Sequence, residues 1–275
     1  MRKNNSIFAE ALLTLWASLI VLPLIWIFYV SLKTNYEFYL NPWALPESPQ
    51  FGNYINAIVT LNLGPVFLNT LYFVFGGLIL GVTVNTMAAY ILTRLEWKGK
   101  KFMMGLIMLS LFLPGINILV PQYVLAVFFK LNNSITGLIL LINMALSAFD
   151  ILLMSSFMRS IPKELEESAR IDGASMLTIF WKIIFPLSMP GIITISIFRF
   201  LNLYNDFINP FIYLTDPSKH TVAVSVYYAN TVLRYTSNYV TLFAAIVVSL
   251  VPTLVVYAIF QKRVVAGATI GAVKG

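Results

Sequence analysis

The chain has 275 residues, of which 59% are apolar and only 11% are charged, and its formal net charge is +7. A soluble domain of this length could not bury so much apolar surface, so the composition excludes an ordinary soluble enzyme and a disordered chain. The absence of cysteine excludes a disulfide framework, a thiol nucleophile and a cysteine-based metal site. We therefore expect lipid to be the solvent for much of the chain.

Long uncharged segments predict the membrane spans, because a membrane-crossing helix needs about 20 apolar residues. We expect an all-α membrane protein with six transmembrane helices. The predicted spans are 11–32, 66–93, 102–129, 131–158 with Asp150 inside it, 183–198 followed by Arg199 and Asp206, and 235–261. Gly77 and Gly81 predict close helix packing in the second span.

The distribution of lysine and arginine predicts the orientation of these spans. With the N-terminus inside, the inner segments hold 13 basic residues and the outer segments hold 4. Cytoplasmic loops carry such an excess of positive charge, and this also explains the net charge without nucleic acid. Both termini are therefore predicted to be cytoplasmic, with the whole of residues 1–275 forming one multi-pass domain.

Two outer loops have signs of local order. The first, residues 33–65, is rich in proline, and the second, about residues 210–234, contains the turn signal Asp216-Pro217. A short helix is expected over 221–233. The only histidine of the chain, His220, falls in this second loop, where we expect a solvated side chain rather than a catalytic one.

The longest inner loop begins at Arg159 and has the pattern of a helix, a tight turn and a second helix. Pro162 is accepted in a first helical turn. Three acidic residues follow, and negative side chains in a first turn stabilise a helix through its dipole. They are Glu164, Glu166 and Glu167. Asp172-Gly173 is predicted to end this helix, because glycine adopts the left-handed conformation at little cost.

Ser175 is predicted to cap the second helix, which runs through Ile184 and ends at Pro186. Composition leaves two interpretations of the first helix open. It lies on the inner membrane surface and either inserts into a cleft of a soluble partner or simply floats at the interface as a charged helix.

The spacing of this loop resembles a known signature. Glu167-Ser168-Ala169, three residues, Gly173, nine residues, Ile183, one residue and Phe185-Pro186 closely resemble the loop motif of bacterial ABC importer permeases, in which Ser168 is replaced by alanine and Phe185 by leucine. The flanking Ile161-Pro162, Ile171-Asp172-Gly173-Ala174 and Phe180 resemble the carbohydrate branch of that family. The tail 267–275 resembles the C-terminus of the second permease of the maltose type.

The resemblance implies a type I ABC importer permease fold in the plasma (inner) membrane of a bacterium. It implies as partners a second homologous permease, two ATPase subunits, an extracytoplasmic solute-binding protein and a carbohydrate substrate. ATP and Mg²⁺ would belong to the ATPase, with no cofactor in this chain. The loop at about 159–190 would couple to one ATPase, and the tail 262–275 would reach toward the ATPase dimer.

By the same resemblance, particular residues are assigned to these contacts. The coupling interface would comprise Glu164, Glu167, Ser168, Ala169, Arg170, Asp172, Gly173 and Ala174. The tail contact would comprise Gly271, Ala272, Val273 and Lys274.

The chemistry that the chain lacks agrees with a non-catalytic subunit. No segment reads as a phosphate-binding Gly-x₄-Gly-Lys-Ser/Thr loop, and a single histidine excludes a His-Glu-x-x-His zinc helix. A membrane-embedded enzyme is thus disfavoured, and no metal ligands are predicted. The alternative is a stand-alone ion-coupled secondary transporter, but the sequence lacks a clear internal repeat and such a transporter would leave the inner loop unexplained.

Polar residues inside the spans are candidates for a pathway, because a charge in the membrane tends to face an interior or a cavity. The fifth span offers four such residues, Arg199, Asn202, Asp206 and Asn209. Their spacing of 3, 4 and 3 residues predicts that they form one stripe along a helix. This stripe lines the sugar pathway or bonds to neighbouring helices. A second stripe in the fourth span, Asn143, Ser147 and Asp150, is expected to bond between helices or between subunits.

Overall fold

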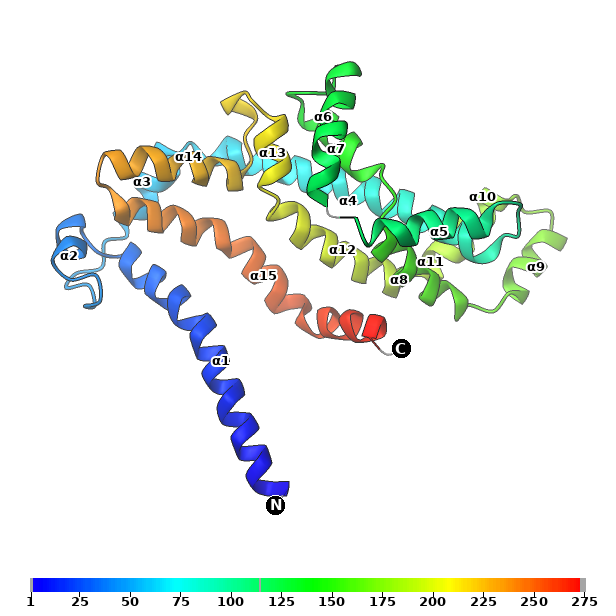
Figure 1. The fold of residues 1–275 in the computed structure, drawn as a ribbon, viewed down its shortest axis with the longest axis horizontal. Helices are drawn as coiled ribbons and strands as arrows, with labels where there is room; N and C mark the ends of the chain where they lie inside the picture. The colour runs from blue at the N-terminus through cyan, green and yellow to red at the C-terminus, as the bar shows by residue number, and fades with distance from the viewer. Residues whose placement is uncertain (1, 114, 273–275) are drawn as a thin grey trace. The chain divides into compact units, whose positions relative to one another are not determined.

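The computed structural model describes residues 2–113 and 115–272, and all secondary structure in these ranges is helical (Figure 1). The helices are α1 (Arg2–Ser31), α2 (Asn35–Leu40), α3 (Gly52–Thr60), α4 (Leu63–Arg94), α5 (Lys100–Ser110), η1 (Gly115–Ile118), α6 (Leu119–Phe128), α7 (Ile135–Asn143), α8 (Ala148–Arg159), α9 (Glu164–Ile171), α10 (Met176–Ile179), η2 (Phe180–Ile184), α11 (Phe185–Leu187), α12 (Met189–Tyr204), α13 (Ile208–Tyr213), η3 (Pro217–Lys219), α14 (Val222–Tyr235) and α15 (Tyr239–Ala272). The predicted all-α class is confirmed.

The predicted spans differ in how continuous they are. Three are single helices that are long and apolar enough to cross a membrane, over Glu10–Ser31, Leu63–Arg94 and Tyr239–Lys262. The fourth is the bent pair α7 and α8, with an angle of 58°, and the fifth is the bent pair formed by Met176–Leu187 and Met189–Tyr204, with an angle of 77°. The third is divided among α5, η1 and α6.

Backbone hydrogen bonds explain the bend in the fourth span. The Ser147 side chain caps α8 by accepting the N–H of Asp150, at 3.3 Å. The N–H of Ser147 itself donates to Oδ1 of the buried Asn85 on α4, at 2.7 Å. Because both groups find partners inside the protein, the chain bends here without leaving polar backbone exposed to lipid.

The fifth span begins differently from the prediction. Ser175 caps α10 as expected, and its Oγ accepts the N–H of Thr178 at 3.2 Å. The helix does not end at Pro186, however, but continues through Leu187. A π-helical turn, η2, precedes the proline, with the Phe185 N–H donating to the carbonyl of Phe180. Proline has no N–H to donate to the preceding turn, and the wider turn accommodates this loss.

The chain divides into two compact units. Unit 1 comprises Met1–Val66 and Val222–Pro252. Its α1 has exposed apolar side chains such as Leu13 and Trp16, at 68% and 66% exposure, so this surface requires lipid or a partner. The end of α1 packs on the start of α15, where the Trp26 and Phe243 rings lie 5.3 Å apart.

The two loops that are predicted to lie on the outer side have local order, as expected. In the first, Thr34 and Glu37 form a reciprocal capping box at the start of α2. In the second, Asp216 caps η3 by accepting the N–H of Ser218 at 3.0 Å, and the expected helix is α14. His220, however, is only 7% exposed, so the expectation of a solvated histidine is wrong.

Unit 2 comprises Phe67–Thr221 and Thr253–Gly275. It holds two apolar clusters. The first joins α4, α8, η2 and α12 through fully buried residues such as Ala89, Ile151, Ile184 and Ile195. The second joins α4, α7 and α13 through Phe73, Leu138 and Tyr213. The candidate sites below are placed by these two clusters.

Candidate functional site

The loop of unit 2 that is predicted to lie on the inner side forms the expected helix and turn. Helix α9 runs from Glu164 to Ile171, and Gly173 follows with a φ of +83°. The N–H of Gly173 donates to Arg170 O at 3.0 Å, and the N–H of Ala174 donates to Ala169 O at 2.9 Å. These two bonds define a Schellman motif, which satisfies the last carbonyls of the helix and sets the direction in which the chain leaves it.

Most side chains of α9 are exposed. Ile171 is 87% exposed and Leu165 is 43% exposed. The other exposed members of the predicted coupling set are Glu164, Glu167, Ser168, Arg170, Asp172 and Gly173. Two exposed apolar side chains among charges provide the mixed surface by which a helix can bind a groove of another protein.

Helix α9 is held by a buried ion pair. Glu166 is 4% exposed, and its Oε1 lies 3.2 Å from Nε of Arg94 at the end of α4. Tyr90, one helical turn earlier on α4, donates its hydroxyl to Glu166 Oε2 at 3.1 Å. Arg94 also donates to the carbonyls of Met158 and Ile161, near the end of α8 and just after it. Arg94 thus ties α9 to two other helices.

Sequence reasoning missed Glu166, since it assigned the acids of this loop to a helix dipole and a partner. Of the predicted coupling residues, Ala169 and Ala174 are half-buried and pack against the first apolar cluster of unit 2. Ala169 lies three residues after Glu166, so the two share one side of the helix. That spacing was the available signal that Glu166 points inward.

The predicted tail residues fall at or beyond the end of α15. Gly271 and Ala272 belong to that helix, whereas Val273 and Lys274 lie outside the described residues.

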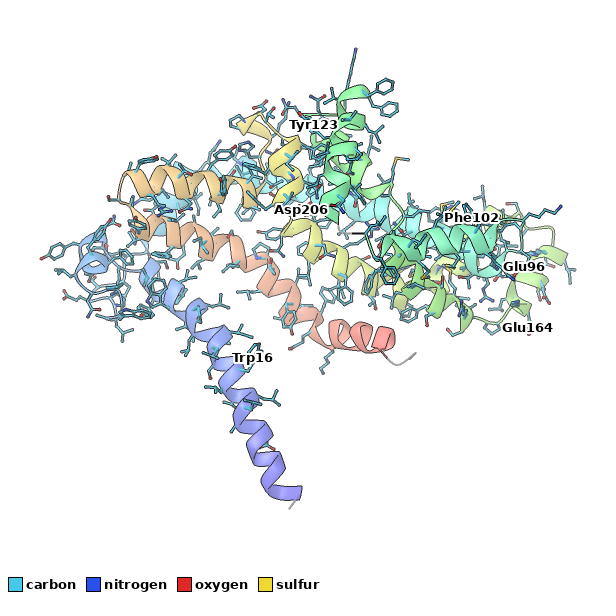
Figure 2. All side chains as sticks on the ribbon, in the orientation of Figure 1. Trp16, Glu96, Phe102, Tyr123, Glu164 and Asp206 are labelled. Carbon is cyan, nitrogen blue, oxygen red and sulfur yellow. The ribbon has the colours of Figure 1, made fainter. Side chains whose placement is uncertain are left out.

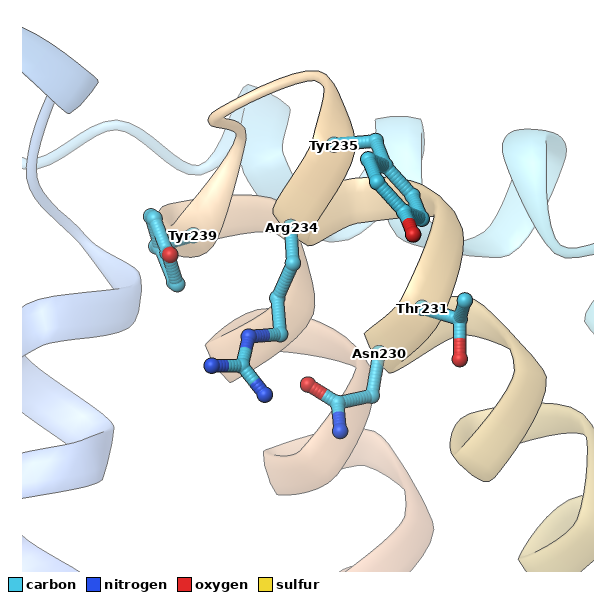
Figure 3. A pocket seen from close by; sticks show the side chains of 5 residues that line it. All are labelled: Asn230, Thr231, Arg234, Tyr235 and Tyr239. Atoms are coloured by element: carbon cyan, nitrogen blue, oxygen red, sulfur yellow. The ribbon is translucent and has the colours of Figure 1, made fainter.

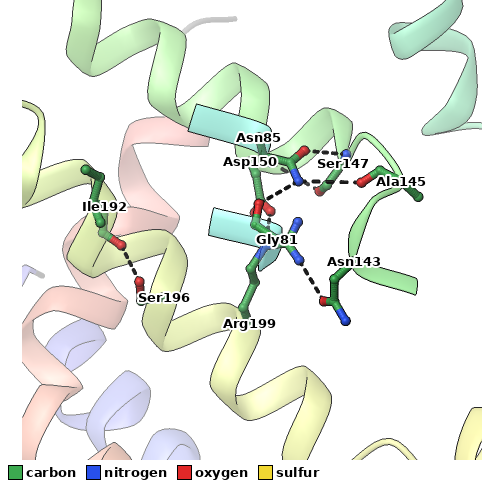
Figure 4. Close-up of polar contacts among 9 residues, drawn as sticks. All are labelled: Gly81, Asn85, Asn143, Ala145, Ser147, Asp150, Ile192, Ser196 and Arg199. Carbon is green, nitrogen blue, oxygen red and sulfur yellow. Dashed lines mark hydrogen bonds and ion pairs between the residues drawn. The ribbon is translucent and has the colours of Figure 1, made fainter. Parts of the chain in front are cut away.

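A second buried ion pair lies between α8 and α12. The Nε of Arg199 lies 2.5 Å from Oδ2 of Asp150, and its Nη1 donates to Oδ1 of Asn143 at 3.2 Å (Figure 4). The side chains of Arg199 and Asp150 are 12% and 4% exposed. The two predicted polar stripes therefore meet, and the expectation that the fourth-span stripe bonds between helices is confirmed at Asp150.

Two glycines of α4 make room for this cluster. A Cβ at Gly81 would lie 2.1 Å from Nη1 of Arg199, and one at Gly77 would lie 2.9 Å from Nδ2 of Asn143. Both distances are shorter than side chains tolerate. The expectation that these glycines allow close helix packing is confirmed.

The predicted fifth-span stripe is not continuous. Arg199 and Asn202 belong to α12, which ends at Tyr204, whereas Asn209 belongs to α13. Asp206 lies in the break and accepts from both the N–H and the amide of Asn209, at 3.2 and 2.8 Å. The prediction of one helical stripe is therefore wrong, because the helix stops before Asp206.

Three of the four residues still share one cavity. Arg199, Asn202 and Asp206 line a space of about 330 Å³ together with Asn143 and Asp150. Asn209 is absent from its lining and instead holds Asp206. Amide and carboxylate groups over an apolar wall can bind hydroxyl-rich molecules, because they supply donors and acceptors for neutral hydroxyls.

Unit 1 has a groove of its own between α14 and α15. Its volume is about 370 Å³, and its lining comprises Asn230, Thr231, Arg234, Tyr235 and Tyr239. Figure 3 shows the Arg234 guanidinium and the Asn230 amide extending on the same side. Tyr235 is 88% exposed. Exposed tyrosine and arginine are frequent in protein interfaces.

The ion pairs, the cavity and the groove described above do not have the composition of a metal centre. Within the described residues, no three His, Asp or Glu side chains come together in a way that could hold a metal ion. Glu166 and Asp150 are each paired with an arginine, and Asp206 accepts hydrogen bonds from Asn209.

Comparisons with known proteins agree with this arrangement. The family described as "Binding-protein-dependent transport system inner membrane component" matches residues 77–268. The diacetylchitobiose uptake system permease protein NgcG of Streptomyces coelicolor is 35% identical over 265 residues, covering 96% of this chain and 87% of that protein. The melibiose/raffinose/stachyose import permease protein MelC of Bacillus subtilis is 32% identical over 268 residues, covering 96% of each chain.

A solved structure agrees in fold. A chain of a bacterial ABC transporter involved in the import of the acidic polysaccharide alginate matches with a TM-score of 0.79 and 24% identity, covering 94% of this chain and 95% of that one. The family match extends over the α9 loop, both ion pairs and most of unit 2. The chain therefore belongs to the family of inner membrane components of binding-protein-dependent transport systems.

Proposed function

We propose that this chain is the permease subunit of an ATP-driven ABC importer that moves a carbohydrate across a bacterial inner membrane by alternating access. The carbohydrate class rests on relatives named for diacetylchitobiose and for melibiose, raffinose and stachyose. In this proposal the chain has six spans, with α5 to α6 forming the third, and both termini are cytoplasmic. Residues 1–275 work as one permease domain.

One observation carries the proposal. Helix α9 exposes Leu165 and Ile171 and is fastened through its buried Glu166 to Arg94. A helix that only floated at the membrane surface would need no such buried ion pair. When a partner moves α9, the Glu166–Arg94 contact transmits that movement to the ends of α4 and α8.

The partner that moves α9 is an ATPase. Two ATPase subunits supply ATP and Mg²⁺, and this chain supplies no catalytic group. A second homologous permease completes the pore. A solute-binding protein delivers the sugar, as in the related alginate transporter, which was solved with a periplasmic protein carrying an alginate pentasaccharide. The groove at Arg234 and Tyr235 is part of the surface that receives it.

We further propose that the cavity at Asn202 and Asp206 belongs to the sugar pathway. Arg199 is neutralised by Asp150, so it does not present a free positive charge there. The groups that remain for the sugar are the amide of Asn202 and the carboxylate of Asp206. The tail residues Gly271 to Lys274 contact the ATPase dimer.

The substitution Gly173→Val tests the coupling role. No atom lies within 4 Å of a Cβ at this position, so the change acts through the backbone, where a φ of +83° disfavours a β-branched residue. We expect ATP hydrolysis to continue while sugar uptake falls by about tenfold or more. Gly105→Ala, also without neighbours within 4 Å, is the control. Normal uptake in Gly173→Val would contradict the proposal.

Purification in mild detergent separates this function from an ion-coupled secondary transporter. The importer requires an unlike permease and an ATPase to co-purify with the tagged chain. Recovery of the chain alone, from conditions that keep a known ABC complex intact, would favour the secondary transporter.

A further inference from the structure

A basic groove on unit 2 has no part in the sites described so far. Its volume is about 790 Å³. It lies where the end of α4, the turn at 95–99, the start of α5 and the end of α8 meet, and Figure 2 labels two of its lining residues, Glu96 and Phe102. The side chains that matter for its chemistry are Thr93, Trp97, Lys100, Lys101, Phe102 and Arg159.

The groove has more positive than negative charge. Three cations, Lys100, Lys101 and Arg159, line it with one carboxylate, Glu96. Lys100 is already paired, because its Nζ lies 2.8 Å from Glu96 Oε1 and also donates to Leu95 O at 3.0 Å. This bond also holds the pKa of Glu96 below its usual value. Among the ion pairs of the described residues, none involves Lys101 or Arg159.

Apolar surface continues from the groove along α5. Phe102 is 71% exposed and Trp97 is 39% exposed. Further along the same helix, Leu106 and Leu109 are 45% and 59% exposed. Two cations outside these ion pairs, beside a tryptophan and followed by an exposed apolar helix surface, match the order of groups in a phospholipid, with its phosphate at the interface and its acyl chains below.

We propose that this groove binds the phosphodiester headgroup of an anionic phospholipid of the inner leaflet. Lys101 and Arg159 contact the phosphate, Trp97 lies at the glycerol level, and the acyl chains extend along α5. The proposal rests on the proposed topology, which places this end of unit 2 at the cytoplasmic membrane surface. A bound lipid would brace the ends of α4 and α8 beside Arg94, the residue that fastens α9.

Native mass spectrometry of the purified full complex tests this proposal, with phosphatidylglycerol and phosphatidylcholine as probes. We expect one saturable phosphatidylglycerol site. Its affinity should fall about fivefold for each cation removed, and about thirtyfold in Lys101→Gln/Arg159→Gln. Lys98→Gln/Lys182→Gln removes two exposed charges that do not line the groove and should change affinity less than about twofold. Lys101→Arg/Arg159→Lys should keep the site.

A measurement that leaves both cations in place guards against misfolded variants. Brominated phosphatidylglycerol should quench tryptophan fluorescence, and Trp97→Phe should remove the saturable part of that quenching and leave the part that comes from tryptophans such as the exposed Trp16. Unchanged binding in Lys101→Gln/Arg159→Gln, or equal binding of the two lipids, would overturn the proposal. Displacement of phosphatidylglycerol by inorganic phosphate would assign the groove to a small anion instead. If the unmutated complex bound both lipids equally but still hydrolysed ATP in response to sugar, the lipid site would be ruled out while the proposed transport function would stand.

Discussion

Two arginine–carboxylate pairs in unit 2 use the same chemistry in different surroundings. Arg94–Glu166 joins α4 to the short helix α9, most of whose side chains are exposed. Arg199–Asp150 joins two long helices beside a cavity. The first pair is supported by the Tyr90 hydroxyl and by backbone carbonyls at the end of α8, whereas the second is supported by Asn143 within the bundle. In the proposed function, the first pair transmits the movement of α9 and the second holds the wall of the cavity.

Removal of the Glu166 carboxylate should have the largest effect. Glu166→Gln leaves Arg94 buried without its counter-charge, which costs about 3–5 kcal/mol when a buried pair is broken. We expect the free energy of unfolding to fall by that amount and sugar uptake to be lost. Glu164→Gln removes the same group from an exposed position of α9 and should cost less than about 0.5 kcal/mol. Equal effects in denaturant unfolding would contradict the role of Glu166.

Asp150→Asn should have a smaller effect than Glu166→Gln. Arg199 is 12% exposed and lines the cavity, whereas Arg94 is only 3% exposed, so the unpaired charge is less completely buried and we expect a loss of about 2–3 kcal/mol. Arg199→Gln with Asp150→Asn should restore part of that loss, because no unpaired charge remains. A double-mutant cycle on unfolding free energies measures this coupling. Additive effects of the two substitutions would disprove the pairing.

Gly81→Ala disturbs the second pair from outside it. The new Cβ would meet the Arg199 guanidinium at 2.1 Å, so the arginine must shift, and we expect a cost of about 1–2 kcal/mol. Gly105→Ala, in helix α5 with open space around it, should be neutral or stabilise by up to about 1 kcal/mol. Thermal unfolding of the two variants checks the difference, and the same shift in both would rule out the proposed close contact.

The smallest expected effect concerns His220. Burial lowers the pKa of His220 below its ordinary value of 6.5, so the unfolded chain takes up a proton at a higher pH than the folded chain does. The folded state therefore loses stability as the pH falls below about 6.5. His220→Gln should reduce the drop in melting temperature between about pH 7.5 and pH 5. An unchanged pH dependence in this variant would contradict the burial of a neutral imidazole.

Local signals allowed much of the coupling loop to be predicted. A glycine with positive φ and a serine cap act within a few residues of chain, so the roles of Gly173 and Ser175 follow from their immediate neighbours in the sequence. Glu166 was missed because three neighbouring acids look alike in composition. Their helical phase separates them, since Glu166 shares a side with the half-buried Ala169.

Long-range pairing explains what the sequence left open. Arg199 and Asp150 were both recognised as polar residues in spans, but they lie 49 positions apart, and only the packing of α8 on α12 brings them together. The break after Tyr204 was also missed, because the regular spacing of Asn202, Asp206 and Asn209 indicates one helix, although Asn205-Asp206 and Pro210 stand at the break. Spacing arguments hold within one helix and fail across an unrecognised break.

Site-specific crosslinking tests the central claim most directly, because the chain has no cysteine of its own. A photoreactive label on Ile171→Cys, at the most exposed apolar position of α9, would be compared in the purified complex with one on Tyr36→Cys of α2, where the native residue is 73% exposed. The account predicts an adduct between position 171 and the ATPase subunit, and no such adduct from position 36. Failure of position 171 to label the ATPase, in a complex that contains it and transports sugar, would contradict the assignment of α9 as the coupling helix.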